Sequence, residues 1–321
     1  MTNLLSVTET AGLLRSADDI LIVTHKSPDG DTVGSGSALC ALLRKLGKTA
    51  YVMKNATLTA RLLPYAAPYF PPEDFSPAFI CAVDIADPRL LNEDAKVYAD
   101  AFDLCIDHHP TNTGYAKNTC LDPAAAACGE IIAELAAAPD IGLDSEIALH
   151  AYLAVCTDTG CFKYPSVTAK THRIAARLIE TGINFYHINN TFTEIKSVAR
   201  MSIERTLAEN MAFRLDGRVA LTHITEEAVN TAAAGEDDLE NLSGITRQIE
   251  GVQVGILLRE KDGGWKISVR TSPEVDASEI CGKFGGGGHA GAAGGSFTGS
   301  LEEAKAALFA ACEEVCGANA Q

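Results

Sequence analysis

The stretch ILIVTHKSPDGD, residues 20–31, carries the pattern that decides the fold of this chain. It starts with an apolar, β-branched run, which is typical of a strand buried on both faces. Pro28 and Gly30 then predict a turn, and the chain continues into a helical pattern over residues 32–46. A strand that passes through a short turn into a helix is the first half of a β-α-β unit. The stretch therefore predicts the start of an α/β domain.

The same alternation continues along the first part of the chain and defines its larger domain. We expect an α/β fold in which residues 1–192 form a mostly parallel sheet flanked by helices. Further strands are predicted over residues 49–53, 79–83 and 104–106, and helices over residues 124–138, 144–156 and 168–181.

The pattern changes in the last third of the chain. A helix over residues 193–214 is predicted to link the larger domain to a smaller α/β domain over residues 215–321. The last helix is predicted to begin after Ser300, which has capping-box spacing with Glu303. Strands of the smaller domain are predicted over residues 218–224, 252–258 and 265–271.

Composition excludes several classes of partner. The 321 residues carry a net charge of −16 without a basic stripe, so we expect no long duplex nucleic acid to bind. A nucleic-acid partner should be short, and bound metal ions can supply the local positive charge. No apolar run reaches membrane-spanning length and no secretory signal is visible, which predicts a cytoplasmic protein without a membrane partner. The ten cysteines form no C-x-x-C pair and are expected to be reduced thiols, and a homodimer is left open.

Acidic and imidazole side chains follow directly after several predicted strands and one helix. Because ligands of open α/β sheets bind at the carboxyl ends of the strands, we expect these side chains to converge. The carboxylate that follows the helix lies at the negative end of the helix dipole, which disfavours it by about 0.3–1 kcal/mol unless a cation is bound. The residues are His25, Asp29 and Asp31, then Asp84, then Asp107, His108 and His109, and finally Asp158 after the helix.

This set of side chains suits a pair of hard divalent cations, Mn²⁺ or Mg²⁺, better than structural zinc. Crowded carboxylates repel one another, and two cations about 3.5–4 Å apart would relieve that repulsion, activate a bridging water and stabilise charge on a phosphate. The expected reaction is in-line attack on phosphorus without a covalent enzyme intermediate. Since neighbouring strand residues face opposite ways, one of His108 and His109 is expected to bind metal and the other to reach substrate.

A glycine-rich segment, FGGGGHAGAAG, follows far downstream at residues 284–294. Glycines allow backbone N–H groups to approach an anion closely, and a guanidinium and a hydroxyl shortly before the segment would form a phosphate clamp. The alternative is a flexible loop. The residues concerned are Arg270, Ser272, Gly286, Gly287, Gly288 and His289.

The motifs HKSPDGD, AVDIAD, DHH, TDTGCF and FGGGGHAGAAG occur in this order over nearly the whole chain. Together they resemble the DHH phosphoesterase family, and most of all its compact oligoribonuclease branch, which also dephosphorylates 3′-phosphoadenosine 5′-phosphate (PAP). The resemblance implies a larger domain that binds two manganese ions and a smaller, DHH-associated domain that holds the nucleotide across a cleft. Thr271 stands where relatives often carry serine, which is a mild departure from the family pattern.

The resemblance also implies a role for each candidate residue. His25 and Asp29 would bind one metal ion, while Asp31, His108 and Asp158 would bind the other, with Asp84 bridging both. Asp107 would orient a histidine, and His109 would contact the scissile phosphate and assist catalysis. Arg270, Ser272, the glycines and His289 would hold the terminal phosphate of the substrate.

The expected activity is hydrolysis of short oligoribonucleotides to mononucleotides together with dephosphorylation of PAP. One alternative is a cytoplasmic phosphodiesterase of linear dinucleotides such as pApA. Another is a non-catalytic nucleotide-binding module. The presence of every expected metal ligand favours an enzyme over that module.

Overall fold

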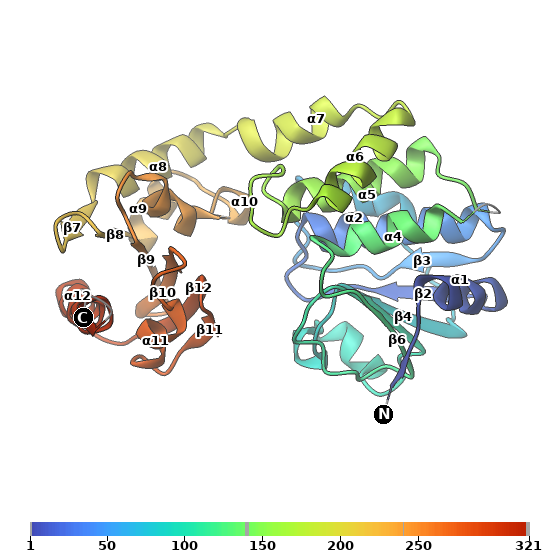
Figure 1. Cartoon of the computed structure of the whole chain (residues 1–321), viewed down its shortest axis with the longest axis horizontal. Coiled ribbons are helices and arrows are strands. Elements are labelled where there is room, and N and C mark those ends of the chain that lie inside the picture. The colour runs from blue at the N-terminus through green and yellow to red at the C-terminus, as the bar shows by residue number, and fades with distance from the viewer. Residues whose placement is uncertain (1, 139–140, 240, 319–321) are drawn as a thin grey trace. The chain divides into compact units, whose positions relative to one another are not determined.

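The computed structural model describes residues 2–138, 141–239 and 241–318 (Figure 1). The chain divides into two compact units, Met1–Ile195 and Lys196–Gln321. Each unit contains its own six-stranded sheet and its own apolar core.

The sheet of the first unit is parallel throughout, with the strand order β1-β6-β5-β4-β2-β3. Its β2 strand, with the sequence ILIV, is buried along its whole length, as expected for a strand covered on both faces. The predicted mostly parallel sheet is confirmed. The strands are β1 (Asn3–Leu4), β2 (Ile20–Val23), β3 (Ala50–Val52), β4 (Phe79–Val83), β5 (Leu104–Asp107) and β6 (Asn118–Leu121).

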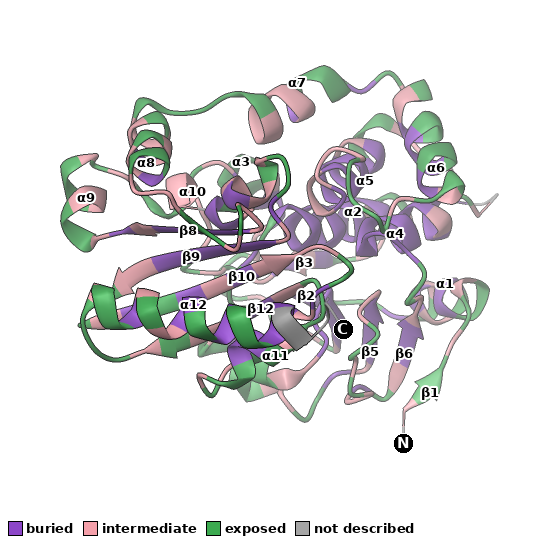
Figure 2. Cartoon of the chain, turned by 60° about the vertical axis from the view of Figure 1, so that its left-hand side comes forward, coloured by how far each residue is buried: buried purple, intermediate pink, exposed green. Residues whose placement is uncertain are grey.

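The two faces of this sheet are covered differently. The main core lies between one face and the longer α-helices, where Figure 2 shows buried residues concentrated in α2, α4 and α5. The opposite face packs on a smaller cluster from irregular segments and the short 3₁₀ helix η3 (Asp94–Tyr98). The helices of the unit are α1 (Val7–Ser16), α2 (Gly30–Lys45), α3 (Leu63–Ala66), α4 (Cys128–Ala136), α5 (Ser145–Asp158), α6 (Ala169–Glu180) and α7 (Phe185–Asn189).

Helices α2 and α5 approach each other so closely that two positions require glycine. A Cβ atom at Gly30 would lie 2.3 Å from Thr157 Oγ1, and one at Gly34 would lie 2.5 Å from the carbonyl oxygen of His150. Neither distance is tolerable for a real Cβ atom. The two glycines therefore allow the start of α2 to lie against the end of α5, which brings Asp31 near Asp158.

The sheet of the second unit has the order β11-β12-β10-β9-β8-β7, with one parallel pair, β8 with β9. Helices α11 (Ala277–Gly282) and α12 (Leu301–Ala318) contribute to the core on one face. Helix α8 (Val198–Glu209), α9 (Glu226–Thr231), α10 (Glu236–Leu239) and the 3₁₀ helix η5 (Leu242–Gln248) contribute to a cluster on the other face. The strands are β7 (Ala212–Arg214), β8 (Val219–Ile224), β9 (Val254–Lys261), β10 (Gly264–Thr271), β11 (Gly287–His289) and β12 (Ala292–Phe297).

The helix predicted over residues 193–214 is shorter than expected. A π-helical turn, Asn190–Glu194, is followed by extended backbone at Ile195, and α8 starts only after Ser197. The Ser197 hydroxyl accepts a hydrogen bond from the Arg200 N–H group at 2.8 Å and so caps a new helix. The apolar periodicity continues across this segment, so it predicted one helix. The periodicity gives no sign of the break before Ser197 that separates the π-helical turn from α8.

Two further expectations concern cysteines and membrane spans. All ten cysteines are free thiols, and nine of them are buried, as the spacing predicts. Among the described residues, no helix combines the length and the apolar character needed to cross a membrane.

Candidate metal centre

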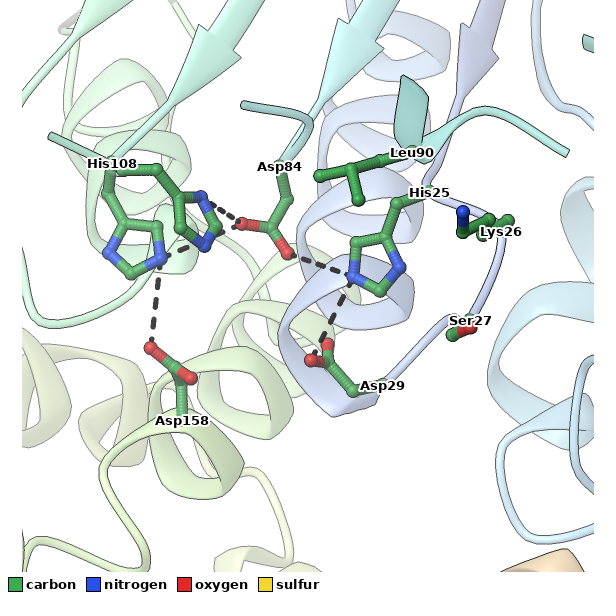
Figure 3. A pocket seen from close by; sticks show the side chains of 9 residues that line it. His25, Lys26, Ser27, Asp29, Asp84, Leu90, His108 and Asp158 are labelled. Carbon is green, nitrogen blue, oxygen red and sulfur yellow. Dashed lines mark ion pairs between the residues drawn. The ribbon is translucent and has the colours of Figure 1, made fainter. Parts of the chain in front are cut away.

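The carboxyl ends of three neighbouring strands deliver the candidate ligands to one edge of the first sheet. His25 lies two residues after β2, Asp84 directly follows β4, and Asp107 ends β5. Two helix termini complete the group, since Asp29 is the N-cap residue of α2 and Asp158 is the last residue of α5. Figure 3 shows the side chains of His25, Asp29, Asp84 and Asp158 turned toward one another. The expected convergence at the strand ends is therefore present.

All of these side chains except that of Asp107 border a cavity of about 250 Å³ at the sheet edge. Lys26 and Ser27 also border it, although the sequence suggested no role for them. The Lys26 ammonium group donates a hydrogen bond to the carbonyl oxygen of Arg89 at 3.1 Å, which holds the Lys26 side chain at the rim of the cavity. The lining residues are His25, Lys26, Ser27, Asp29, Asp84, Leu90, His108, His109 and Asp158.

Two groups of candidate ligands share Asp84. In the first group, His25 Nε2 lies 3.8 Å from Asp29 Oδ2 and 3.7 Å from Asp84 Oδ2. In the second group, His108 Nε2 lies 3.6 Å from Asp84 Oδ1 and 3.7 Å from both Asp31 Oδ2 and Asp158 Oδ2. The two oxygens of one carboxylate thus face two separate clusters, which is the geometry of a bridging ligand.

The spacing within each group fits a cation better than a network of hydrogen bonds. Distances of 3.6–3.8 Å are too long for N–H···O hydrogen bonds. Two ligands that each lie about 2.1 Å from one ion are separated by roughly 3–3.6 Å, close to the observed values. In addition, Asp84 Oδ1 is buried and receives no hydrogen bond from the part of the chain that the structure describes. A buried, unsatisfied carboxylate oxygen is costly, and a divalent cation would satisfy it.

Hydrogen bonds hold the ligands in orientations that suit metal binding. The Nδ1 atom of His108 lies 3.2 Å from the carbonyl oxygen of Ala125 and is assigned as the donor, which leaves Nε2 with a free lone pair facing the carboxylates. The Thr32 hydroxyl donates to Asp84 Oδ2 at 2.5 Å. Asp84 itself has a φ of 61°, a left-handed conformation that Asp and Asn tolerate better than most residues.

Asp31 is held more firmly than the sequence suggested. Its carboxylate accepts hydrogen bonds from the Ser35 hydroxyl at 2.7 Å and from the backbone N–H groups of Cys128 at 2.7 Å and Gly129 at 3.1 Å. Asp31 therefore satisfies the first turn of α4, whose own N-cap residue, Ala127, has no side-chain cap. Ser35 follows Asp31 by four residues on α2, so helical spacing was the signal for this contact, whereas the contact with α4 is tertiary.

The two adjacent histidines do not face opposite ways, and that expectation is wrong. His108 Nε2 and His109 Nδ1 each lie 3.6 Å from Asp84 Oδ1, and their ring centroids are 4.5 Å apart. Strand alternation does not apply because β5 ends at Asp107 and both histidines lie in the following turn.

Asp107 contacts His109 and belongs to neither group of candidate metal ligands. Its Oδ1 atom lies 2.7 Å from His109 Nδ1, and its Oδ2 atom accepts a hydrogen bond from the Asn112 amide at 2.6 Å. Sequence reasoning missed Asn112, which has no motif around it. His109 also belongs to a group with Asp84 and His108 that could hold an ion. The His109 nitrogen that faces Asp84 is Nδ1, however, and Asp107 occupies it, so His109 is a weaker candidate for metal binding than His108 is.

The phosphate-binding candidates all lie in the second unit. Arg270 on β10 is opposite Ala292 on β12, and Ala292 is opposite His289 on β11. Residues that lie opposite one another share a face, so Arg270 and His289 point to the same side of the sheet, two strands apart. The hydroxyl oxygen of Ser272 is buried and is not presented to solvent. The glycine-rich segment is not a loop, because Gly287–His289 forms the edge strand β11.

Comparison with known proteins agrees with this two-part architecture. Residues 19–155 match the DHH family, N-terminal domain, and residues 224–318 match the DHHA1 domain. A bifunctional oligoribonuclease and PAP phosphatase NrnA from Thermus thermophilus is 30% identical over 298 residues, covering 92% of this chain and 89% of the relative. The chain belongs to the DHH family.

Further relatives of this DHH protein span its full length. The bifunctional oligoribonuclease and PAP phosphatase NrnA of Bacillus subtilis is 26% identical, covering 96% of this chain and 98% of the relative. A crystal structure of an exopolyphosphatase-related protein from Bacteroides fragilis superimposes with a TM-score of 0.87 at 26% identity, covering 98% of this chain and 97% of the other. The match to the Bacteroides fragilis structure extends over both units and supports the fold of each.

Burial and mutual repulsion disfavour the ionised form of several carboxylates in the DHH site without cations. Burial, together with the charge of Asp31, raises the pKa of Asp84 well above its ordinary value. The same two causes raise the pKa of Asp158 to about 7. Burial lowers the pKa of His25. The site of this DHH protein therefore stores unfavourable electrostatic energy at neutral pH, which bound divalent cations would release.

We expect this stored repulsion to appear in the stability of the metal-free protein. Because folding raises the pKa of Asp158 from 3.8 to about 7, its favourable contribution is present below pH 3.8 and is lost as the pH rises toward 7. In chelator, Asp158→Asn should therefore melt at the same temperature as the wild type near pH 4 and at a higher temperature at pH 8. Thermal unfolding followed by circular dichroism at both pH values measures the difference.

Asp87→Asn is a matched control, because the pKa of Asp87 is shifted in the opposite direction to that of Asp158. Hydrogen bonds from Arg89 lower the pKa of Asp87, so its stabilising contribution is present at neutral pH and is lost only as the pH falls through the lowered pKa. Asp87→Asn should not raise the melting temperature at pH 8. A melting difference between Asp158→Asn and the wild type that stayed constant from pH 4 to pH 8 would contradict the prediction.

Proposed function

We propose that this DHH protein is a phosphoesterase that hydrolyses short oligoribonucleotides to mononucleotides and removes the 3′-phosphate of PAP. The observation that carries the proposal is the position of Asp84, whose two oxygens face two clusters of candidate metal ligands. The functions of the Thermus and Bacillus relatives support the choice of substrates.

In this proposal two divalent cations are held by the two clusters. His25, Asp29 and Asp84 hold one cation. A histidine in each cluster favours Mn²⁺ over Mg²⁺, because Mg²⁺ prefers an all-oxygen environment with several waters. When bound, the cations would polarise a water for in-line attack on phosphorus and neutralise charge on the phosphate. The second cation would be held by Asp31, Asp84, His108 and Asp158.

His109 assists the reaction in a different way. Asp107 occupies its Nδ1 atom, so Nε2 is the nitrogen that remains to donate to a phosphate oxygen or to the leaving oxygen. The hydrogen bond with Asp107 raises the pKa of His109, which favours the imidazolium form that can donate a proton. Its side chain is 40% exposed at the cavity, so substrate can reach it.

The second unit is proposed to bind the terminal phosphate of the substrate. Arg270 and His289 point to the same side of the sheet, and glycines leave the backbone of β11 accessible. The net charge of −16 supports short, cytoplasmic nucleotide substrates instead of long polymers, because a long polyanion would be repelled outside the site. The residues proposed for the terminal phosphate are Arg270, Gly286, Gly287, Gly288 and His289, and Ser272 is left out because its hydroxyl oxygen is buried.

Alanine substitutions can separate glycines that are needed for folding from a glycine that is needed for binding. A Cβ at Gly286 would lie 2.1 Å from the carbonyl oxygen of Gly294, and one at Gly288 would lie 2.5 Å from that of Ala292. Both variants should melt earlier, by roughly 5 °C or more. A Cβ at Gly287 meets nothing within 4 Å. Gly287→Ala should therefore keep the wild-type melting temperature and raise KM, because the methyl group obstructs the approach of a phosphate.

Thermal unfolding and steady-state kinetics of the three alanine variants test this division. Wild-type kinetics in Gly287→Ala would show that the backbone at this position does not approach the substrate. Wild-type melting in Gly286→Ala would show that the backbone just before β11 does not approach Gly294 on β12 this closely.

The proposed function is tested by direct assay of the full chain. Purified protein is incubated with Mn²⁺ and RNAs of two to five nucleotides, and with PAP and pApA in parallel, with and without chelator. We expect mononucleotides from the RNAs, phosphate release from PAP, and loss of both activities in chelator.

Activity confined to pApA would favour a linear-dinucleotide phosphodiesterase. A relative from Geobacillus thermodenitrificans, a cyclic-di-AMP phosphodiesterase GdpP that is 25% identical, is the reason to include an adenine dinucleotide. Nucleotide binding without any turnover would favour a non-catalytic module.

A further inference from the structure

A second arginine approaches the sheet face that carries Arg270. Arg247 belongs to η5, which packs on β9 and β10. A Cβ at Gly255 on β9 would lie 3.2 Å from Arg247 Cγ and 2.1 Å from Thr246 Oγ1. The aliphatic part of the Arg247 side chain therefore lies directly over Gly255, and glycine at this position leaves room for it.

The sheet register places Gly255 beside Arg270. The two residues are directly opposite in the antiparallel pairing of β9 with β10, so Arg247 covers the position adjacent to Arg270 on the same face. Opposite Cβ positions are about 5 Å apart, so Arg247 Cγ is at most roughly 9 Å from Arg270 Cβ. Both side chains extend beyond these atoms by several bonds. Their guanidinium groups can therefore reach a single phosphate.

The Arg247 guanidinium has no close polar partner within the part of the chain that the structure describes: no hydrogen bond is formed, and no carboxylate lies within 4 Å. Arg259 lies on the same face of β9, but its Nη2 atom is 3.1 Å from Glu236 Oε1. Interaction with Ser272 is the largest cause of the lowered pKa of Glu274, and the charge of Arg247 also contributes. The Arg247 charge is therefore close to the Ser272–Glu274 turn, next to the proposed phosphate residues.

We propose that Arg247 and Arg270 together bind the terminal phosphomonoester of the substrate, and that Arg247 selects this dianionic group over a phosphodiester or a free hydroxyl. The inference rests on the proposed function. A phosphomonoester has a second pKa near 6 and carries close to two negative charges at neutral pH, whereas a diester carries one. Two guanidinium groups match the dianion, while a substrate without the terminal phosphate leaves them unpaired.

The test compares three dinucleotides, one with a 5′-phosphate, one with a 3′-phosphate and one with neither, on the wild type and three variants. Arg247→Ala should raise KM for the phosphorylated dinucleotide that the wild type prefers by about 10- to 100-fold, with kcat nearly unchanged. The unphosphorylated dinucleotide should be hydrolysed as by the wild type. Arg247→Lys should recover part of the loss, because lysine supplies the charge without the bidentate fork. Arg259→Ala, the matched control, should behave as the wild type.

The outcomes distinguish this inference from the proposed function. If Arg247→Ala impaired all three dinucleotides equally, the residue would have only a structural role and the inference would be wrong. If it changed nothing while the wild type remained active, the inference would fail and the proposed function would stand. If the wild type hydrolysed none of them, the proposed function would fail. Calorimetric binding of AMP and of adenosine would then decide, because Arg247→Ala must weaken AMP binding selectively or the inference is overturned.

Discussion

Replacing Asp84 by asparagine should reduce hydrolysis of every substrate by about 1000-fold or more, equivalent to roughly 4 kcal/mol of transition-state stabilisation. Asp84 Oδ1 faces His108 and Asp84 Oδ2 faces His25, so this one carboxylate serves both clusters. Asparagine keeps the shape and tolerates the left-handed backbone conformation, but it offers one neutral oxygen in place of two charged ones. Kinetics at saturating Mn²⁺ and measurement of bound metal per chain test both consequences, and we expect fewer than two ions to remain.

Asp87→Asn is the matched control for this experiment. Asp87 lies three residues further along, and its two oxygens are paired with Arg89 Nε at 2.9 Å and Nη2 at 2.8 Å, away from the metal clusters. Loss of this exposed ion pair should leave kcat and metal content unchanged. If Asp84→Asn retained activity within a factor of about ten of the wild type, a bridging role for Asp84 would be untenable.

Replacing His109 by asparagine should lower kcat by about 100- to 10,000-fold while both metal ions remain bound. His109 lies at the cavity, and its ring is held by Asp107, so removal of the imidazole takes away a proton donor without removing a ligand of either cluster. Kinetics with an ordinary nucleotide substrate and with a 4-nitrophenyl nucleotide ester separate two roles. If His109 protonates the leaving oxygen, the loss should be much smaller with 4-nitrophenolate, which leaves without a proton.

His187→Asn serves as the control, since His187 is exposed on α7 and lies outside the cavity. An equal loss of kcat on both substrates would indicate that His109 stabilises charge on the phosphate and does not transfer a proton. Loss of bound metal in His109→Asn would instead assign His109 to the metal ligands, which would contradict the separation between His108 and His109 drawn from the hydrogen bond with Asp107.

Local pattern was sufficient for much of this protein because the chemistry is concentrated in short segments at the ends of strands. When an apolar strand is followed by HKSPDGD or by DHH, the acidic and imidazole side chains of the motif lie at the carboxyl edge of the parallel sheet. This placement does not depend on distant parts of the chain. The parallel sheet, the convergence of the candidate residues and the family could therefore be predicted from residues that are neighbours in sequence.

Prediction failed where an outcome depended on residues far apart in the chain or on where an element ends. The opposite orientation expected for His108 and His109 assumed that both histidines continue the strand, whereas β5 ends before them, at Asp107. The expected linker helix ignored Ser197, whose capping of α8 becomes visible only when the backbone on either side is known. The loop alternative for the glycine-rich segment failed because β11 finds its partner in β12.

The sequence by itself determined which side chains this protein can offer to a phosphate ester and at which edge of the sheet they gather, because strand direction and turn residues are local properties. Tertiary packing alone decided which side chain faces both ligand clusters and which contacts hold the side chains in place. The close approach of α2 and α5 through Gly30, the capping of α4 by Asp31 and the burial of Asp84 each join segments that are distant in the chain. Such contacts depend on shape and on low-dielectric burial in the folded core, and neither is encoded in the spacing of residues along a single strand or helix.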